Sequence, residues 1–410
     1  MNLSKLLDPD IWGLLRDYEG ADPVVVSAAL RALDHPGEIA AAVASQVQLR
    51  ALATAKFPDV TDGLFTRTGI EQATRPEVAA LHAKRFRNAG CQLVADLGCG
   101  CGADALALAK AGMGVLALEI DENTHVCATQ NLRIYPRVQV RLGDATKLDM
   151  EALAGEGVDA IFADPARRGP RGRILDPNAW SPPLGMVLSW RGRFPNLGVK
   201  VAPGINYASI PCDAQAQWVS VRGEVVEASL WFGALRSGTG RSAVVFDDVG
   251  NDHYWCFEGD PSVGAGVAPT AGLGDYIAEL DGAALRGGAL AWAVENWHGS
   301  GLVFPGVAYL WAPTPPPEPV APFVRTWHVE DVLPLKPQLI RQWLRERQVG
   351  VLEIKKRGTD ISPQVLRAKV LPVKRANNGT GAKQRSFTLL ATRTLLQGKP
   401  RHVAVMARPI

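Results

Sequence analysis

The middle of this chain alternates between short apolar runs and stretches with helical spacing. The apolar runs are rich in Val, Leu and Ile and are typical of buried strands, whereas the stretches between them have the three-to-four-residue period of helices. We expect strands at residues 94–97, 114–119, 138–142, 158–163 and 197–201, with helices at 105–109 and 123–132 between the first three. This alternation predicts an α/β fold with a parallel, doubly wound sheet. Apolar, β-branched runs at 225–232 and 242–246 predict the antiparallel end of that sheet.

The two ends of the chain have different patterns. Residues 27–55 are rich in Ala and Leu at helical spacing, so the N-terminal region is predicted to be helical. Near the other end, six prolines between residues 313 and 322 predict a semi-rigid connection. Beyond it we expect two helices, at residues 337–347 and 362–369. Three strands are expected at residues 349–354, 386–392 and 402–407. This order predicts a small α+β module with its helices on one face of a sheet.

These patterns divide the chain into four regions. We expect a helical N-terminal region over 1–88, an α/β domain over 89–250, a connecting, ferredoxin-like region over 251–324 and a basic α+β domain over 325–410. The last region holds 18 Lys and Arg against 5 Asp and Glu, a net charge of +13, while the rest of the chain has a net charge of −10. Such asymmetry suggests that the basic part contacts a nucleic acid.

A glycine-rich loop joins the first strand of the α/β domain to a helix. Asp96 lies near the end of that strand, and Gly98, Gly100 and Gly102 follow at alternate positions. Glycine allows a tight turn and the close approach of a ligand, and the N-terminus of the next helix attracts anionic groups. The first two glycines with Ala103 also fit the dinucleotide fingerprint, and a turn without a ligand is a third interpretation. Asp96 favours a cationic ligand, because its carboxylate would repel a pyrophosphate and attract an ammonium group.

The loop resembles the D-x-G-x-G-x-G motif of class I S-adenosylmethionine-dependent methyltransferases. That resemblance implies a Rossmann-like sheet and a methyl donor held by Asp96 and the three glycines. Glu119 ends the next strand, where a carboxylate can accept hydrogen bonds from both ribose hydroxyls of either candidate cofactor, with Asp121 as a nearby substitute. Asp144 follows the third strand. In the enzymes that this chain resembles, an acid at this point binds the adenine amino group. The backbone N–H of the next residue, here Ala145, contacts the adenine ring. The alternative for Asp144 is a helix N-cap.

The fourth strand leads into Asp164-Pro165-Ala166-Arg167-Arg168. An acid followed by proline at this point resembles the D-P-P-aromatic motif of enzymes that methylate exocyclic amino groups of nucleobases. The chain departs from that motif at Ala166 and Arg167, although arginine can also stack on a base. The resemblance implies that Asp164 and Pro165 are catalytic and that Arg167 and Arg168 contact a base or a phosphate. Arginines that only solvate the surface are the alternative.

The segment before the first strand contains a helix-start signal. Thr74 and Glu77 fit a T-x-x-E capping box for a helix at 78–86. The same segment resembles the one that covers the cofactor in trimethylguanosine-synthase-like RNA methyltransferases. The resemblance implies that Phe65, Gln72 and Thr74 lie at the mouth of the cofactor or substrate site.

The basic C-terminal region contains Leu352-Glu353-Ile354-Lys355-Lys356-Arg357-Gly358. Together with the E-Q-x-T sequence at 71–74 and the D-P-A-R-R sequence, this stretch resembles bacterial class I methyltransferases with a THUMP-like C-terminal domain. THUMP domains bind RNA in modification enzymes, so the resemblance implies an RNA substrate. We expect Lys355, Lys356 and Arg357 to contact phosphates, with a solvated strand end as the alternative.

Other residue types narrow the classes of function. Six cysteines without a C-x-x-C pair, and seven scattered histidines, indicate free thiols and no metal site. The sequence has neither a signal-peptide pattern at its start nor a run of eighteen apolar residues, so we expect a cytoplasmic protein without a membrane span.

The sequence therefore predicts an S-adenosylmethionine-dependent methyltransferase that acts on RNA, at a base and through an amino nitrogen. Two alternatives stay open. An RNA-binding protein with an inactive methyltransferase domain is suggested by the departure at D-P-A-R-R. A small-molecule methyltransferase is the other, and it would not need the basic C-terminal region.

Overall fold

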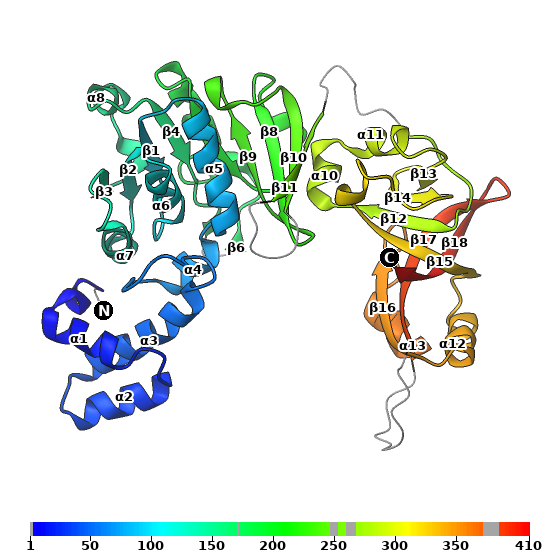
Figure 1. Ribbon diagram of the computed structural model, residues 1–410, viewed down its shortest axis with the longest axis horizontal. Helices are drawn as coiled ribbons and strands as arrows, with labels where there is room; N and C mark the ends of the chain where they lie inside the picture. The colour runs from blue at the N-terminus through cyan, green and yellow to red at the C-terminus, as the bar shows by residue number, and fades with distance from the viewer. Residues whose placement is uncertain (1–2, 170–171, 247–252, 260–267, 372–384) are drawn as a thin grey trace. The chain divides into compact units, whose positions relative to one another are not determined.

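The computed structural model describes residues 3–169, 172–246, 253–259, 268–371 and 385–410, and Figure 1 traces the chain. The chain forms two compact units. The first contains Met1–Gln217 with Glu227–Gly240, and the second contains Trp218–Val226 with Arg241–Ile410. This division differs from the four predicted regions, because the N-terminal helices share the first unit with the α/β sheet.

The N-terminal part of the first unit is helical, as predicted. Its helices are α1 (Pro9–Asp17), α2 (Pro23–Ala32), α3 (Gly37–Ala53), α4 (Arg67–Gln72) and α5 (Pro76–Asn88), preceded by the 3₁₀ helix η1 (Leu3–Leu7). Each of α1 and α2 starts with an aspartate N-cap followed by proline, at Asp8 and Asp22. The predicted stretch 27–55 is two helices, because Pro36 lacks an N–H and precedes the first turn of α3.

The sheet of the first unit has the predicted parallel order. Its strands are β1 (Leu93–Leu97), β2 (Gly114–Glu119), β3 (Val138–Leu142), β4 (Ala160–Ala163) and β7 (Leu197–Val201), in the order β7-β4-β1-β2-β3. Each neighbouring pair is parallel, and β9 (Glu224–Trp231) pairs antiparallel with β7. Helices α6 (Ala103–Lys110), α7 (Glu122–Leu132), α8 (Met150–Gly155) and α9 (Leu184–Ser189) connect the parallel strands. The α/β prediction is therefore confirmed.

The register of the sheet brings the candidate residues to one edge. Leu97 lies opposite both Leu118 and Ala163, and Ala163 lies opposite Val199. Because the residues that follow paired positions on parallel strands share one edge, Asp96, Glu119, Asp144 and Asp164 all lie near the carboxyl ends of their strands. The same register places Lys200 beside Asp164. That edge is the place to look for the functional site.

The second unit has a seven-stranded sheet of order β13-β14-β12-β15-β18-β17-β16. Its strands are β12 (Tyr276–Leu280), β13 (Gly301–Phe304), β14 (Val307–Ala312), β15 (Val324–Pro334), β16 (Val349–Lys356), β17 (Arg385–Leu396) and β18 (Lys399–Pro409). The region predicted as 251–324 therefore shares a sheet with the basic domain, because β12 pairs with both β14 and β15. This unit also contains the antiparallel pair β10 (Gly240–Phe246) and β11 (Tyr254–Glu258), with β8 (Gln215–Val221) and β9 divided between the units.

Helices α12 (Pro337–Glu346) and α13 (Pro363–Val370) pack together on one face of β16–β18, as predicted. Ile340, Trp343 and Leu366 belong to this core, together with Leu389 and Met406 of the sheet. The unit also contains α10 (Gly282–Gly287) and α11 (Leu290–Glu295). In the parts of both units that the structure describes, no helix has the length and apolarity needed to cross a membrane.

Candidate functional site

The glycine loop after β1 has the conformation that its sequence predicts. Gly98, Gly100 and Gly102 have φ angles of +93°, +58° and +95°, a region in which side chains cause strain. A Cβ on Gly98 would lie 2.9 Å from the carbonyl oxygen of Asp164, so this glycine allows the loop to approach the end of β4. A Cβ on Gly100 would meet no atom of the described residues within 4 Å. The loop is therefore tightly packed at Gly98 and open at Gly100, as a ligand cradle requires.

Asp96 is buried with one carboxylate oxygen unsatisfied. The residue is 1% exposed, and its Oδ2 has no hydrogen-bond partner among the described residues. Burial, followed by the charges of Asp104 and Asp164, raises the pKa of Asp96, while the charge of Lys200 opposes that shift. A buried acceptor without a donor is costly, and a ligand ammonium group would satisfy it. Asp96 and the open loop therefore fit the cationic donor that the resemblance implies.

The carboxylate of Glu119 accepts three backbone hydrogen bonds, one of them from the glycine loop. Its Oε2 accepts from the N–H of Gly100, and its Oε1 accepts from those of Ile120 and Asp121, each at 2.9 Å. Asp121, the possible substitute, instead caps α7 by accepting from the N–H of Thr124 at 2.8 Å. The structure thus separates the two acids, and Glu119 is the one held against the loop.

Asp144 has the capping role that was its alternative interpretation. Its Oδ1 accepts from the N–H of Thr146 at 2.9 Å and from the Thr146 hydroxyl at 2.7 Å, at the start of the 3₁₀ helix η2 (Ala145–Lys147). These two hydrogen bonds lower the pKa of Asp144. The cap fixes the Asp144 side chain and the Ala145 amide beside the end of β3.

Asp164 is held by an ion pair at the end of β4. The ammonium group of Lys200 donates to Asp164 Oδ2 at 2.9 Å and to the hydroxyl of Thr74 at 2.9 Å. The Lys200 side chain is 6% exposed and that of Asp164 is 26% exposed, so the lysine lies beneath the aspartate. Pro165, which follows, is buried, and Arg167 is half-buried without an ion pair among the described residues. The Arg168 side chain lies outside the described residues.

A buried polar network continues inward from Thr74. The Thr74 hydroxyl donates to Asp104 Oδ2 at 2.5 Å, and Asp104 Oδ1 lies 2.8 Å from His82 Nδ1. His82 Nε2 lies 2.7 Å from Oε1 of Glu227 on β9, which also accepts from Ser229 at 2.9 Å. Asp104, His82 and Glu227 are all less than 9% exposed. The network therefore links β9 to the Asp164 ion pair through α5, α6 and β7.

The network favours a charged histidine. Burial alone would lower the pKa of His82, but the charge of Glu227 and the hydrogen bonds to Asp104 and Glu227 outweigh it and raise that pKa to about 9. His82 also packs on the rings of Phe162 and Trp231, with centroids 4.9 and 5.5 Å away. A protonated His82 thus lies between two carboxylates in an otherwise apolar enclosure.

This arrangement predicts a pH-dependent stability. The pKa of His82 is higher in the folded than in the unfolded chain, so its contribution of about 3 kcal/mol is complete below the unfolded value and is lost as pH rises through about 9. His82→Gln should lower the melting temperature most at and below about pH 6.5 and least in buffer above about pH 9. His298→Gln, which removes an exposed histidine, should have the melting temperature of the wild type at every pH. A His82→Gln deficit that is constant with pH would contradict the assignment.

The predicted capping box at Thr74 and Glu77 is wrong. Helix α5 starts at Pro76 with Arg75 as its N-cap and has no side-chain capping bond. The Thr74 hydroxyl is not available for capping, because it donates to Asp104 and accepts from Lys200. The capping-box pattern fails here because the Thr74 hydroxyl bonds the buried carboxylate of Asp104 on α6 instead of a backbone N–H of α5.

The other residues of that segment lie apart from one another. Phe65 is 2% exposed, and its N–H and C=O both bond the side-chain amide of Gln46. Gln72 is exposed, and the ammonium of Lys56 fixes its segment by donating to the carbonyls of Glu71 and Ala73 at 2.9 and 2.8 Å. Only Thr74 of the three predicted residues enters the buried network.

Two of the three cations predicted to contact phosphates, Lys355 and Arg357, form ion pairs within the second unit. Glu279 on β12 accepts from the ammonium group of Lys355 and from the guanidinium of Arg357, each at 2.8 Å. Lys355 also lies 5.2 Å from the centroid of the Trp327 ring. Lys356 is exposed and has no ion pair among the described residues. Of the three cations, Lys356 is therefore the one most available to a ligand.

The sequence interpretation missed four members of the network. His82, Asp104, Lys200 and Glu227 have no motif of their own, since they lie on four different elements. Two of them had a visible signal, because Lys200 and Glu227 are single charges within otherwise apolar runs. A charge at such a position is buried and needs a partner.

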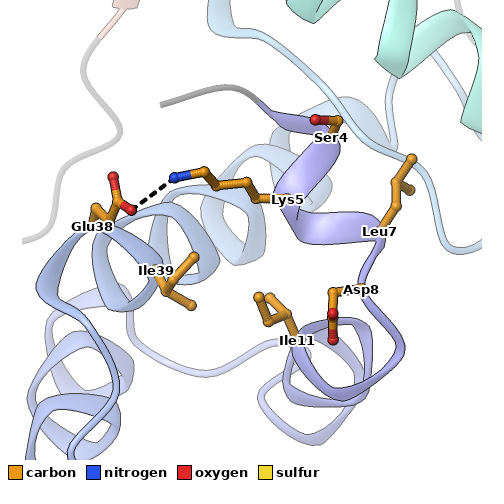
Figure 2. A pocket seen from close by; sticks show the side chains of 7 residues that line it. All are labelled: Ser4, Lys5, Leu7, Asp8, Ile11, Glu38 and Ile39. Carbon is orange, nitrogen blue, oxygen red and sulfur yellow. Dashed lines mark hydrogen bonds and ion pairs between the residues drawn. The ribbon is translucent and has the colours of Figure 1, made fainter.

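A separate hollow of about 560 Å³ lies among the N-terminal helices. Figure 2 shows the ion pair between Lys5 and Glu38 at its side, 3.0 Å long, with Ile11 and Ile39 below. Both charged side chains are more than half exposed, and none of the candidate residues above lines the hollow. Among the described residues, no group of three His, Cys, Asp or Glu side chains could hold a metal ion.

Comparison with known proteins relates this chain to methyltransferases. A family model described as RNA cap guanine-N2 methyltransferase matches residues 91–173, and one described as THUMP domain-like matches residues 324–409. Proteins from two Mycobacterium tuberculosis strains, CDC 1551 and H37Rv, are 31% identical over 324 residues, which is 76% of this chain and 82% of theirs. Both are named as uncharacterised S-adenosylmethionine-dependent methyltransferases. The crystal structure of a Porphyromonas gingivalis W83 protein assigned to the methyltransferases matches 98% of both chains with a TM-score of 0.75 at 21% identity, a likeness of fold.

Proposed function

Since this chain belongs to the S-adenosylmethionine-dependent methyltransferases, we propose that it methylates RNA, at a nucleobase and through an amino nitrogen. The observation that supports this proposal most is the Asp164-Pro165 sequence at the carboxyl end of β4, within the segment that matches RNA cap guanine-N2 methyltransferases. The THUMP-like match in the basic second unit supports RNA as the acceptor.

The donor site of this proposal uses the edge of the sheet in the first unit. S-adenosylmethionine supplies a methyl group on a positively charged sulfur. The unsatisfied Oδ2 of Asp96 would accept from its ammonium group, and the open side of the loop at Gly100 would admit it. Glu119 would bind the ribose hydroxyls, and Asp144 with the Ala145 amide would bind adenine. Gly98 and Gly102 maintain the loop in its turned conformation.

The acceptor site of this proposal starts at Asp164. Its Oδ1 accepts no hydrogen bond from the described residues, so it is available to an amino group. Pro165 has no N–H, which leaves the neighbouring carbonyl groups as acceptors for the same amino group. Arg167 would stack on the base or bind its phosphate. Phe65 and Thr74 are buried, so they would support this site from within, and Gln72 is the exposed member of that segment.

RNA would bind the second unit over α12 and α13. Arg345, Arg367 and Lys369 are exposed there and have no ion pair among the described residues. Arg341, one helical turn before Arg345, donates through Nε to the carbonyl of Lys369 at 2.9 Å, which joins the two helices at this point. Unpaired cations on adjacent helices suit a phosphate backbone better than Lys355 and Arg357, whose charges Glu279 already offsets.

This surface can be tested by removing two charges. The double variant Arg345→Gln and Lys369→Gln should weaken binding to RNA and reduce the slope of log affinity against log salt by about 2. A matched control, Lys399→Gln with Arg401→Gln, removes the same charge from the exposed start of β18. Filter binding across a salt series measures both. Equal losses in the two variants would mean that net charge alone, and not this surface, governs binding.

The acceptor is identified most directly by comparing nucleosides from cells with and without this gene. Mass spectrometry of digested RNA should show one methylated nucleoside that is absent from the deletion and restored by the wild-type gene. The Asp164→Asn gene should not restore it. If the RNA nucleosides are unchanged and a methylated small metabolite differs between the two strains, the acceptor is a small molecule and not RNA.

A further inference from the structure

Lys200 is a buried cation that the methyltransferase motifs do not explain. It interrupts the apolar strand β7, is 5% exposed, and donates to Thr74 and Asp164 at 2.9 Å each. Burial alone would lower the pKa of Lys200, but the charges of Asp164, Glu227 and Asp104 outweigh it and raise that pKa. Lys200 is therefore charged at neutral pH and cannot serve as a proton acceptor.

The fold fixes where this charge lies. Ala163 of β4 is opposite Val199 of β7, so the next residues, Asp164 and Lys200, are neighbours at the edge of the sheet. Only one oxygen of Asp164 is used, because Lys200 bonds Oδ2 and no described residue donates to Oδ1. A carboxylate held through one oxygen has a defined orientation for the other.

The position of Lys200 depends in turn on the network behind it. Thr74 accepts from Lys200 and donates to Asp104, and His82 joins Asp104 to Glu227. All five of these residues are less than 9% exposed, so water does not compete for their hydrogen bonds. The ammonium group therefore has little freedom to move away from Asp164.

We propose that Lys200 is a positioning residue for methyl transfer, which holds Oδ2 of Asp164 so that Oδ1 meets the acceptor nitrogen. This inference rests on the proposed function. As the nitrogen lone pair forms the new N–C bond, the S–C bond of the donor breaks with its electron pair on sulfur, and the nitrogen loses a proton to Asp164 Oδ1 or water. Lys200 neither gains nor loses a proton in this step.

The test uses the full-length chain, S-adenosylmethionine with a tritiated methyl group, and total RNA from cells that lack the gene. With the donor saturating, Lys200→Met should reduce the transfer rate about 100-fold, since a misplacement of about 1 Å in a reacting group has an effect of that size. Thr74→Val keeps the Lys200 charge and removes only the hydroxyl that fixes it, so it should reduce the rate less, by about tenfold. Thr74→Val also keeps the proposal testable if Lys200→Met does not fold.

A double-mutant cycle separates positioning from structure. In the Asp164→Asn background, Lys200→Met should cause less than about a threefold further loss, because the group through which Lys200 acts is already altered. A purely structural lysine would cause the same fold loss in both backgrounds, and that result would overturn the inference. Undiminished transfer by Lys200→Met would also overturn it, while leaving the proposed function intact. If the wild type labels no RNA, the proposed function fails, and the inference that rests on it fails as well.

Discussion

Asp96→Asn is expected to remove most of the affinity for S-adenosylmethionine while leaving the chain folded. Removing the charge of one partner in a buried charge pair costs about 2–5 kcal/mol of binding free energy, which corresponds to a loss of at least about 30-fold in affinity. Asparagine has nearly the same shape as aspartate, but it has no charge to attract the ammonium group of the donor. Isothermal titration of the donor into the wild type and the variant measures the effect.

The stability of the Asp96 variant should change in the other direction. In the free chain, the carboxylate is 1% exposed with an unsatisfied oxygen and a raised pKa, so its charge does not stabilise the fold. Asp96→Asn should therefore melt at the same temperature as the wild type or higher. Asp149→Asn is a matched control, because this exposed N-cap of α8 lies outside the network. If Asp96→Asn binds the donor with the affinity of the wild type, Asp96 does not belong to the donor site.

Asp164→Asn is expected to separate donor binding from methyl transfer. Oδ1 of Asp164 is the available acceptor beside the glycine loop, so losing its charge should reduce the transfer rate by about 10²- to 10³-fold. Donor affinity should stay within about threefold of the wild type, since the side chains predicted to contact the donor lie on β1, the glycine loop, β2 and the loop after β3. Titration with the donor and single-turnover transfer to RNA measure the two effects independently.

Asp176→Asn is the control for this variant. Asp176 lies in the same loop, is exposed and caps a 3₁₀ helix, and asparagine caps as well as aspartate does. It should bind the donor and transfer the methyl group like the wild type. If Asp164→Asn loses donor binding as strongly as Asp96→Asn, then Asp164 belongs to the donor site and the division of roles is wrong.

The sheet edge could be predicted from the sequence because it follows from local patterns and one topological rule. Apolar runs that end in Asp96, Glu119, Asp144 and Asp164 are visible in one dimension, and parallel strands bring such ends together. The strand bounds agree closely for β2, β3 and β7, which are predicted and observed over the same residues. Glycines at alternate positions also give the observed left-handed turns.

The buried network could not be predicted in the same way. Thr74 fits a local capping rule, yet its hydroxyl bonds Asp104 and Lys200, which are 30 and 126 residues away. His82 bonds Glu227 across 145 residues of sequence. Tertiary contacts therefore override the local preference, and no spacing within the sequence reports which charges will share a buried site.

The basic region shows the same limit of local patterns. Lys355, Lys356 and Arg357 form a run of charge that predicts phosphate contacts. Glu279, which is 76 residues before Lys355 and outside the predicted basic domain, pairs with two of the three. The pairing depends on β12 and β15–β18 forming one sheet, a feature that the proline-rich stretch between β14 and β15 concealed.

The central claim, that this methyltransferase acts on RNA, is tested most directly by methyl transfer to RNA from cells that lack the gene. The chain and tritiated S-adenosylmethionine would be incubated with that RNA, and the label retained would be measured before and after ribonuclease treatment. We predict label that is sensitive to ribonuclease with the wild type and that accumulates at least about 100-fold more slowly with Asp164→Asn. Donor binding by the wild type without any labelled RNA would contradict the account.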